Sequence, residues 1–233
     1  MKKTAIILAS GKGRRLNLGY NKVFARLAGK SILAYSIEAF EKNKNIDEII
    51  IVSAKENLAE IKKLIKKNKY SKINKVIPGG ARRQDSSYNG VMSLDNPDSK
   101  DIVLIHDGAR PFLRKKIINE SILNTIKYGA SVTGLISKND IKEIDKKNFI
   151  KQTLNREQIF ITQTPQAFRV DLIQKAHIHA RKKKIQTNDE ASLLEIIGKK
   201  VKVVLGDEYN IKITTPFDLQ FAKNYVKNFR YNS

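Results

Sequence analysis

The stretch that decides the fold runs from Thr4 to Arg15 and reads Thr4-Ala5-Ile6-Ile7-Leu8-Ala9-Ser10-Gly11-Lys12-Gly13-Arg14-Arg15. Its first five residues form a short apolar run with β-branched side chains, which predicts a buried strand. Two glycines follow, where backbone N–H groups can approach a ligand without obstruction from a Cβ atom. Because two arginines and then Lys22 add positive charge, the loop after this strand is suited to a polyphosphate.

This loop departs from the two common phosphate-binding motifs. A Walker A loop needs Gly-x-x-x-x-Gly-Lys-Ser/Thr, which the chain does not supply. The dinucleotide fingerprint needs a third glycine at the position that Leu16 occupies. The pair Gly11 and Gly13 is therefore weak evidence by itself, and an ordinary turn with solvated basic residues is the alternative.

Beyond the loop, apolar residues alternate between helical spacing and short continuous runs. Helical patterns cover 32–40, 58–65, 83–94, 170–180, 188–197 (with Asn188 as N-cap) and 216–229, and apolar runs cover 46–52, 76–77, 102–105 and 201–204. Short connections join these segments, and the runs are typical of strands buried on both faces. The pattern predicts a doubly wound, mostly parallel α/β sheet of the Rossmann-like type.

Three loops with reactive side chains follow predicted strands, at residues 9–22, 78–87 and 106–111. In parallel sheets, ligands bind beyond the carboxyl ends of the strands. We therefore expect these loops to meet at one rim of the sheet. This convergence is stronger evidence for a site than any single motif.

The alternation stops at about residues 137–163, where isoleucines alternate with polar residues around the turn Asp145-Lys146-Lys147-Asn148. This segment predicts a β-hairpin that projects as an arm from a single domain of residues 1–233. A hairpin alone in water is only marginally stable. We therefore expect the arm to pack on a second subunit.

The composition narrows the class of protein. The 45 basic and 23 acidic residues give a formal net charge of +22, which suggests a nucleic-acid ligand. The lysine runs are interleaved with aliphatic rather than aromatic residues, so nucleic acid is not expected as the primary ligand. The chain contains no cysteine, no segment of signal-peptide type and no stretch long enough to span a membrane. These features predict a cytoplasmic protein.

Taken in order, the motifs resemble those of the 2-C-methyl-D-erythritol 4-phosphate cytidylyltransferases, a nucleotidyltransferase family of isoprenoid biosynthesis. The resemblance runs from near residue 5 to near residue 220. It rests on residues 9–15, Asn21-Lys22, Gly79-Gly80, Arg83-Gln84-Asp85-Ser86, His106-Asp107-Gly108-Ala109-Arg110-Pro111, Thr153-Leu154-Asn155-Arg156, 163–168, Asp189-Glu190-Ala191-Ser192 and 210–214. It implies that the phosphate of methylerythritol phosphate attacks the α-phosphorus of CTP and releases pyrophosphate.

The resemblance also assigns the nucleotide side of the site. It implies that Arg15, Lys22 and Lys212 stabilise the phosphates that react. It implies that Mg²⁺ is the cofactor, with Asp107 as its carboxylate ligand, although a structural hydrogen bond is the alternative for Asp107. The positions that would surround the cytidine are Ala9, Ser10, Gly11, Gly80 and Ser86, and Ser86 has the alternative of a helix-start residue.

On the acceptor side, the resemblance implies that Arg110, Arg156 and Thr164 hold the sugar phosphate together with Asp107. Arg156 would reach the active site of the second subunit of a homodimer. Asp189 would contact substrate hydroxyls, or it would only favour the dipole of the helix that starts there.

Three positions depart from the family pattern, and two rival functions remain. The arm has Asn139-Asp140 where the family has Asp-Thr, Asn188 replaces a threonine, and Ala81 replaces an acidic residue. These changes bear on the acceptor more than on the nucleotide. The rivals are ribitol 5-phosphate cytidylyltransferase and a non-catalytic RNA-binding module.

Overall fold

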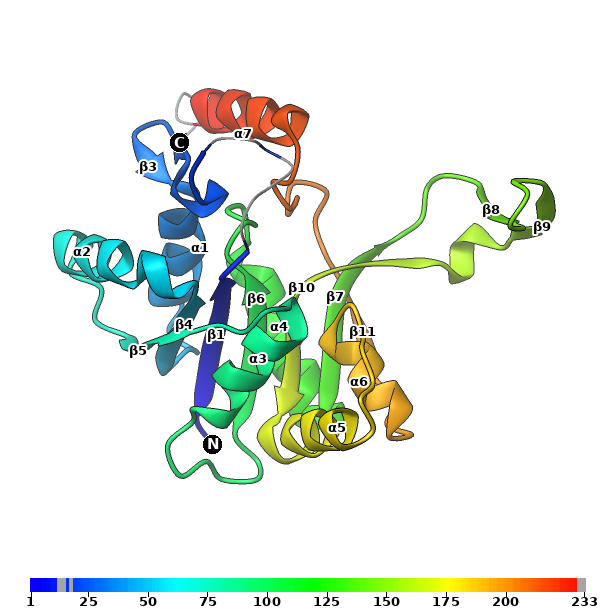
Figure 1. Ribbon diagram of the computed structural model, residues 1–233, viewed down its shortest axis with the longest axis horizontal. Coiled ribbons are helices and arrows are strands. Elements are labelled where there is room, and N and C mark those ends of the chain that lie inside the picture. The colour runs from blue at the N-terminus through cyan, green and yellow to red at the C-terminus, as the bar shows by residue number, and fades with distance from the viewer. Residues whose placement is uncertain (12–15, 17–18, 230–233) are drawn as a thin grey trace.

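A seven-stranded sheet forms the centre of the molecule in the structure, a computed structural model that describes residues 1–11, 16 and 19–229 (Figure 1). The strand order is β11-β7-β10-β6-β1-β4-β5. The strands are β1 (Lys3–Ala9), β4 (Glu48–Ser53), β5 (Ile73–Pro78), β6 (Ile102–Asp107), β7 (Ala130–Ile136), β10 (Phe160–Arg169) and β11 (Lys202–Leu205). Only β10 runs antiparallel to its neighbours, β6 and β7. The predicted mostly parallel α/β fold is confirmed.

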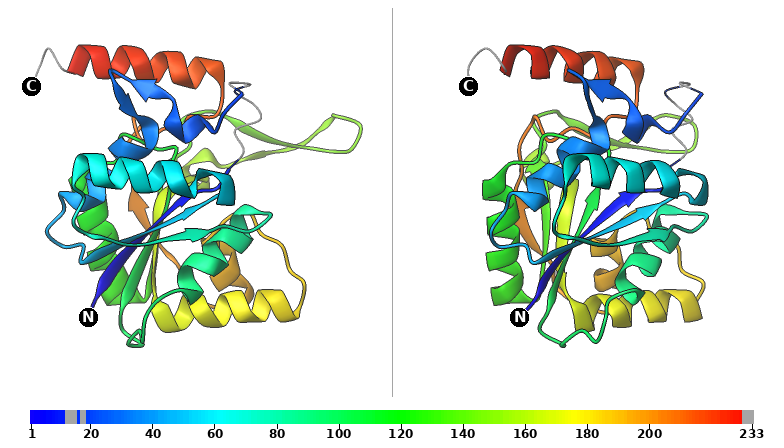
Figure 2. Two further views of the ribbon diagram at one scale, coloured as in Figure 1. Left: turned by 60° about the vertical axis from the view of Figure 1, so that its left-hand side comes forward. Right: turned by 90° about the vertical axis from the view of Figure 1, so that its left-hand side faces the viewer.

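Helices cover both faces of this sheet (Figure 2). They are α1 (Ile32–Glu41), α2 (Leu58–Asn68), α3 (Arg83–Met92), α4 (Lys115–Tyr128), α5 (Val170–Lys182), α6 (Glu190–Ile196) and α7 (Pro216–Phe229). Helices α1, α2 and α4 pack on one face and α3, α5 and α6 on the other. None of the helices among the described residues combines the length and the apolar character that a membrane crossing requires.

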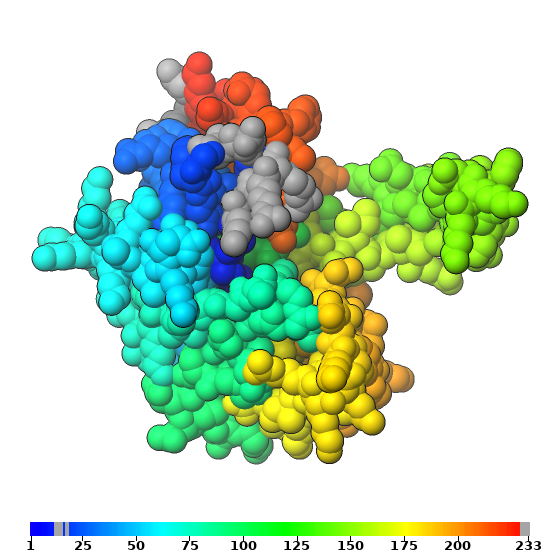
Figure 3. All heavy atoms as spheres, in the orientation of Figure 1, coloured from blue at the N-terminus to red at the C-terminus, as the bar shows by residue number. Residues whose placement is uncertain are grey.

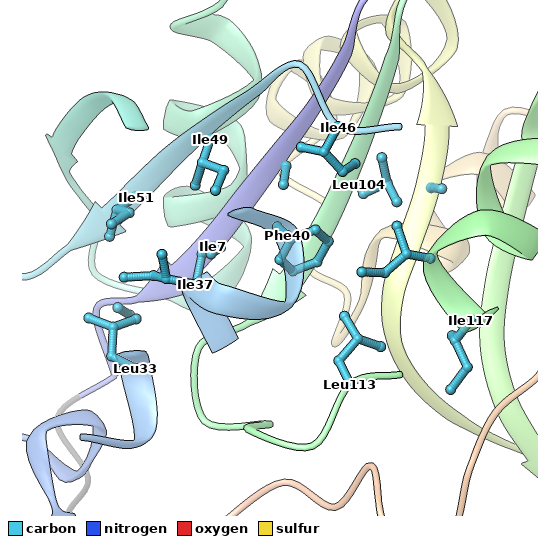
Figure 4. Packing of buried hydrophobic residues seen from close by; sticks show 14 of the residues in the cluster. Ile7, Leu33, Ile37, Phe40, Ile46, Ile49, Ile51, Leu104, Leu113 and Ile117 are labelled. Atoms are coloured by element: carbon cyan, nitrogen blue, oxygen red, sulfur yellow. The ribbon is translucent and has the colours of Figure 1, made fainter. Parts of the chain in front are cut away.

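The period of two in β1 separates the two halves of the core. Ala5 and Ile7 face the α1 side, where Leu33, Ile37 and Phe40 pack against them (Figure 4). Ile6 and Leu8 face the opposite side, with residues of α3, α5 and α6. Because both faces are covered, β1 is apolar along almost its whole length instead of alternating with polar residues.

A third, smaller apolar cluster lies at the end of the sheet where β1 and β6 terminate. There α7 crosses above a two-stranded ribbon of β2 (Arg26–Leu27) and β3 (Lys30–Ser31) (Figure 1). Leu27 and Ile213, both fully buried, pack together with Ala222 of α7. This cluster holds the segment after Lys22 against the segment that contains Lys212.

The structure differs from the sequence-based expectation at the N-cap of α6 and in β2, β3, α4, β7 and β10, which were not predicted. The N-cap of α6 is Asp189 and not Asn188, because the extended Asp189 places its carboxylate 3.1 Å from the backbone nitrogen of Ser192. The chain also forms β7, which its pattern does not reveal. The polar residues Ser131 and Thr133 interrupt its apolar run, and they are buried through hydrogen bonds to hydroxyls of α4.

The segment between β7 and β10 extends away from the sheet (Figures 1 and 3). It contains the hairpin of β8 (Ile141–Ile144) and β9 (Ile150–Leu154) and a single 3₁₀ turn, η4 (Arg156–Gln158). Asp145 closes the hairpin turn, since its carboxylate accepts hydrogen bonds from the backbone nitrogens of Lys147 (2.8 Å) and Phe149 (2.9 Å).

Packing of α3 on the sheet leads to a stability prediction at Gly90. A Cβ atom at this position would lie 2.6 Å from Cγ2 of Ile6 and 3.1 Å from Cγ2 of Val52. Gly90→Ala should therefore lower the free energy of unfolding by about 1–2 kcal/mol, because the steric cost exceeds the gain in helix propensity. Urea denaturation measures the change.

Ile6→Ala provides the matched background, since it removes the methyl group closest to the added Cβ atom. In that background Gly90→Ala should cost clearly less than in the natural chain. An equal cost in both backgrounds, or a stabilised Gly90→Ala protein, would contradict close packing as the cause.

Candidate active site

A cleft of about 820 Å³ lies at the carboxyl ends of β1, β4, β5 and β6. Its walls come from the loops after these strands and from the segment before α7. The residues that line it are Leu8, Ala9, Ser10, Gly11, Lys22, Val23, Ala54, Lys55, Glu56, Gly79, Gly80, Ala81, Arg82, Arg83, Asp107, Ala109, Lys212 and Thr214. The three loops that we expected to converge therefore contribute to one cleft.

One wall of the cleft consists of small residues joined by hydroxyl groups. The Ser86 hydroxyl lies 2.8 Å from that of Ser10 and accepts a hydrogen bond from the backbone nitrogen of Gly80 (3.1 Å). A Cβ atom at Gly79 would lie 2.7 Å from Ser10 Cβ, and one at Gly80 would lie 2.3 Å from Asp85 Cβ. Glycine is therefore required at both positions for the loops to approach this closely.

Ser86 itself is fully buried, and its described contacts are with the protein. Its hydroxyl also donates to the backbone oxygen of Arg82 (3.1 Å). Ser86 thus connects the loop after β1 with the start of α3, while Ser10 and Gly80 face the cleft. Ser86 therefore lies in the first turns of α3 and supports the wall of the cleft, and its contact with a cytidine stays a prediction.

Lys22 and Lys212 line the same cleft, although 190 residues separate them in the sequence. The ammonium group of Lys22 donates to the backbone oxygen of Ile213 at 2.7 Å. The backbone nitrogen of Ile213 in turn donates to the oxygen of Ala109, beyond β6, at 2.9 Å. The segment that carries Lys212 is therefore fixed to the rim from two sides.

Asp107 is a negative charge surrounded by three cations at the base of the cleft. Its carboxylate lies 2.9 Å from Nζ of Lys212, 3.0 Å from Nε of Arg83 and 3.5 Å from Nε of Arg110. Burial alone would raise the pKa of the Asp107 carboxyl, but the three cations outweigh this effect and lower the pKa well below its ordinary value. Asp107 is therefore ionised at neutral pH.

Arg83 links Asp107 to a second buried carboxylate. Its NH1 atom donates to both oxygens of Glu190, at 2.7 and 2.9 Å. Burial would lower the pKa of the Arg83 guanidinium, but Glu190 and Asp107 raise it above its ordinary value. Arg83 is thus a permanently charged bridge between α6 and the end of β6.

A hydrogen-bond network beneath Asp107 fixes the end of β6. Burial lowers the pKa of His106 to about 4, so its ring is neutral at neutral pH. The carbonyl of Arg110, which only accepts, lies 3.1 Å from Nε2 of His106, so Nε2 carries the hydrogen. Nδ1 then accepts from the Thr164 hydroxyl (3.0 Å), and this hydroxyl accepts from the backbone nitrogen of Asp107 (3.1 Å). Every donor in this network has an acceptor.

Three further predicted residues that the structure describes are not among those that line the cleft. Arg110 is largely buried and donates to the backbone oxygen of Asn210 at 2.7 Å. Asp189 caps α6 and also accepts from the Gln166 amide at 2.9 Å. Arg156 lies on the arm, where it pairs with Asp140 at 3.3 Å and does not line the cleft. Arg15 lies outside the residues that the structure describes.

Sequence reasoning missed two residues of this site, Arg83 and Glu190. Both stand inside motifs that carry the family resemblance: Arg83 lies three residues before Ser86, and Glu190 follows Asp189. An arginine or glutamate near a helix start is commonly a surface residue that favours the helix dipole or remains solvated. Only the fold shows that the side chains of α3 and α6 meet.

Comparisons with known proteins agree over almost the whole chain. The family model described as IspD: 2-C-methyl-D-erythritol 4-phosphate cytidylyltransferase matches residues 3–228. The protein of that name from Clostridium tetani is 42% identical over 228 residues, which cover 98% of this chain and 92% of that protein. The one from Clostridium perfringens is 42% identical over 226 residues, or 97% of this chain and 99% of that protein.

Two solved structures are similar in fold as well as in sequence. The 4-diphosphocytidyl-2C-methyl-D-erythritol synthase from Anaerococcus prevotii has 34% identity and a TM-score of 0.87, covering 97% of this chain and 96% of that one. The 2-C-methyl-D-erythritol 4-phosphate cytidylyltransferase from Francisella tularensis has 30% identity and a TM-score of 0.81, covering 97% and 100%.

The charge cluster around Asp107 leads to a second stability prediction. Asp107→Asn keeps the shape of the side chain but leaves Arg110 and Lys212 without their buried counter-charge. The free energy of unfolding should therefore fall by about 3 kcal/mol. Urea denaturation at neutral pH and low salt measures it.

Asp95→Asn is the matched control, since Asp95 pairs with Lys75 at 2.6 Å while its side chain is 65% exposed. Loss of this exposed pair should cost less than about 1 kcal/mol. Equal costs for the two variants would mean that Asp107 does not organise the cluster.

Proposed function

This chain belongs to the 2-C-methyl-D-erythritol 4-phosphate cytidylyltransferase family, and we propose that its central cleft transfers the cytidylyl group of CTP to 2-C-methyl-D-erythritol 4-phosphate. The phosphate of the acceptor attacks the α-phosphorus of CTP, and the bond from that phosphorus to the bridging oxygen breaks. The products are 4-diphosphocytidyl-2-C-methyl-D-erythritol and pyrophosphate. The family membership and the contents of the cleft support the same reaction.

The observation that carries this proposal is the convergence of Lys22, Lys212 and a wall of small residues in one cleft. The reaction concentrates negative charge around a phosphorus atom that has an entering and a leaving oxygen. Positioned cations stabilise such charge, and they need little rearrangement when the reaction occurs. Lys22 and Lys212 are anchored through Ile213 and Asp107, so their ammonium groups are pre-positioned for this task.

We place the cytidine against the wall formed by Ala9, Ser10, Gly11 and Gly80, with Ser86 supporting it from behind. Backbone groups of small residues leave room for a flat base and offer donors and acceptors for it. Arg15 is proposed to contribute to the triphosphate site, because its loop begins at the rim of this cleft.

Mg²⁺ suits this site through oxygen ligands. Magnesium is commonly held by one or two carboxylates together with substrate phosphates. Among the described residues that line the cleft, Asp107 and Glu56 carry carboxylates, and no group of three or more His, Cys, Asp or Glu side chains forms a metal site in the described part of the chain. We propose Asp107 as the protein ligand, with the ion offsetting the charge of the triphosphate.

The acceptor is proposed to lie on the side of Arg110, Thr164 and Asp189. Within one chain Arg156 lies on the arm, outside the cleft, and its side chain is about half exposed. The arm also exposes Ile144, Phe149 and Ile150, with 53%, 69% and 64% of their surfaces accessible. Exposed apolar side chains on a projecting hairpin support a homodimer in which each arm reaches the partner's cleft.

The ion pair between Asp140 and Arg156 bears on the unusual arm sequence. A carboxylate at this place would repel a substrate phosphate if it stood alone. Paired with Arg156, its charge is offset. Methylerythritol phosphate therefore remains the proposed acceptor, and ribitol 5-phosphate is the alternative that an assay has to compare.

Lys22→Met and Lys212→Met test the nucleotide side, since methionine keeps the length of the apolar stem but has no charge. Each variant should lose about 10²–10³-fold in kcat because a charge on the reacting phosphates is removed. Pyrophosphate release with CTP, UTP or ATP and with each of the two sugar phosphates measures this loss and the substrate preference.

Lys42→Met is the control, because Lys42 is exposed and pairs with Glu38 on α1. It should leave kcat unchanged. Near-normal turnover in both cleft variants would place the site elsewhere. A preference of the natural protein for ribitol phosphate would change the acceptor, and salt-dependent RNA binding without turnover would support a binding module instead.

Mixing of two inactive variants tests the arm. If Arg156 acts across the dimer, a mixture of Arg156→Ala and Lys212→Met subunits forms hybrids in which one of two sites is intact. Roughly a quarter of the natural activity should then return after the subunits exchange. Pyrophosphate release measures the recovery, and light scattering measures the dimer.

Each variant incubated alone provides the control and should stay inactive. If Arg156 acts within its own chain, every site in the mixture lacks one of the two groups. The absence of any recovery between exchanging subunits would therefore contradict an arm that acts on the partner.

A further inference from the structure

Glu190 is a buried carboxylate whose role the proposed reaction leaves open. It is the first residue of α6 and only 1% exposed. Its carboxylate binds NH1 of Arg83 through both oxygens, and its backbone nitrogen donates to the Gln166 amide oxygen at 3.0 Å. A buried carboxylate lowers the stability of a protein unless it is paired with a cation and hydrogen-bonded.

The start of α6 does not require this side chain. Asp189 already caps the helix, because its carboxylate accepts from the backbone nitrogen of Ser192 at 3.1 Å and from its hydroxyl at 2.7 Å. The usual reason for an acidic residue at a helix start is thus met by Asp189. The Glu190 side chain points to Arg83 on α3 instead.

Charges of alternating sign connect Glu190 with the cleft. Arg83 contacts Glu190 at 2.7 Å and Asp107 at 3.0 Å, and Asp107 contacts Lys212 at 2.9 Å. Arg110 lies 3.5 Å from the same oxygen of Asp107 as Lys212. Three cations therefore share two carboxylates, and only Asp107 and its cations adjoin the reacting groups.

We propose that Glu190 is a positioning residue for cytidylyl transfer, which holds Arg83 so that Asp107 keeps Lys212 at the cleft wall. This inference rests on the proposed function. Glu190 binds one end of the guanidinium and balances its charge. Asp107 then retains enough negative charge to orient Lys212 toward the substrates.

The electrostatic consequence of removing Glu190 is specific. Without its charge, Arg83 is balanced by Asp107 alone, and three cations remain around one carboxylate. The attraction between Asp107 and Lys212 weakens, so the position of Lys212 is less well defined. The cleft also becomes more positive, which favours binding of an anionic nucleotide.

Glu190→Gln tests this role because it keeps the shape and removes the charge. We expect kcat to fall about tenfold, since Lys212 is less precisely held. The KM for CTP and the dissociation constant from calorimetry should stay equal or decrease. A general loss of structure would instead weaken nucleotide binding, or reduce the stoichiometry of CTP bound per chain.

A double-mutant cycle tests whether Glu190 acts through Lys212. In the Lys212→Met background, Glu190→Gln should change the single-turnover rate of labelled product formation by less than about twofold, because the group on which it acts is absent. Glu195→Gln on the exposed side of α6 is the matched control and should leave every constant unchanged.

The outcomes separate the two proposals. Absence of turnover in the natural protein would overturn the proposed function. Turnover in the natural protein, with an unchanged kcat for Glu190→Gln or the full tenfold loss also in the Lys212→Met background, would overturn the role of Glu190. Should Glu190→Gln fail to fold, Arg83→Lys replaces it: lysine keeps the charge but cannot bridge both carboxylates, and the same fall in kcat at unchanged KM is expected.

Discussion

The site depends on the electrostatic attraction between one buried carboxylate, Asp107, and the three cations around it. Arg83 comes from α3, Arg110 from the loop after β6, and Lys212 from the segment before α7. Without a shared anion, these groups would repel one another at the base of the cleft. Their mutual repulsion is offset because β6 ends at Asp107, in the middle of the sheet, where all three elements meet.

The apolar core brings the elements that carry these three cations together at the end of β6. Alternate residues of β1 bind the helices of the two faces, so the sheet fixes the direction of each loop at its carboxyl end. The small cluster around Leu27 and Ile213 then joins the rim to α7. Lys22 and Lys212 therefore lie in segments that the apolar clusters pack together.

The sequence allowed the parallel sheet, the order of most elements and the rim with its loops to be predicted, because these depend on apolar periodicity and on where strands end. It also indicated Lys22, Asp107 and Lys212, through motifs in a fixed order. It did not reveal β7, whose Ser131 and Thr133 are buried only because hydroxyls of α4 satisfy them. Nor did it reveal the contact of Arg83 with Glu190, since pairing between side chains of two separate helices has no signature in either segment alone.

The same charges bear on how this cleft could bind a triphosphate on the proposed function. In the structure, Lys212 and Arg83 are paired with Asp107 and Glu190, so their charges are balanced within the protein. The contact of Lys212 is the accessible one, because about a third of its side chain is exposed whereas Glu190 is enclosed. On the proposed function, an incoming phosphate competes with Asp107 for Lys212 while the pair of Arg83 and Glu190 stays intact. Only the contact of Lys212 changes from Asp107 to the phosphate, so little of the protein has to rearrange. Positioned charges accelerate a reaction under this condition.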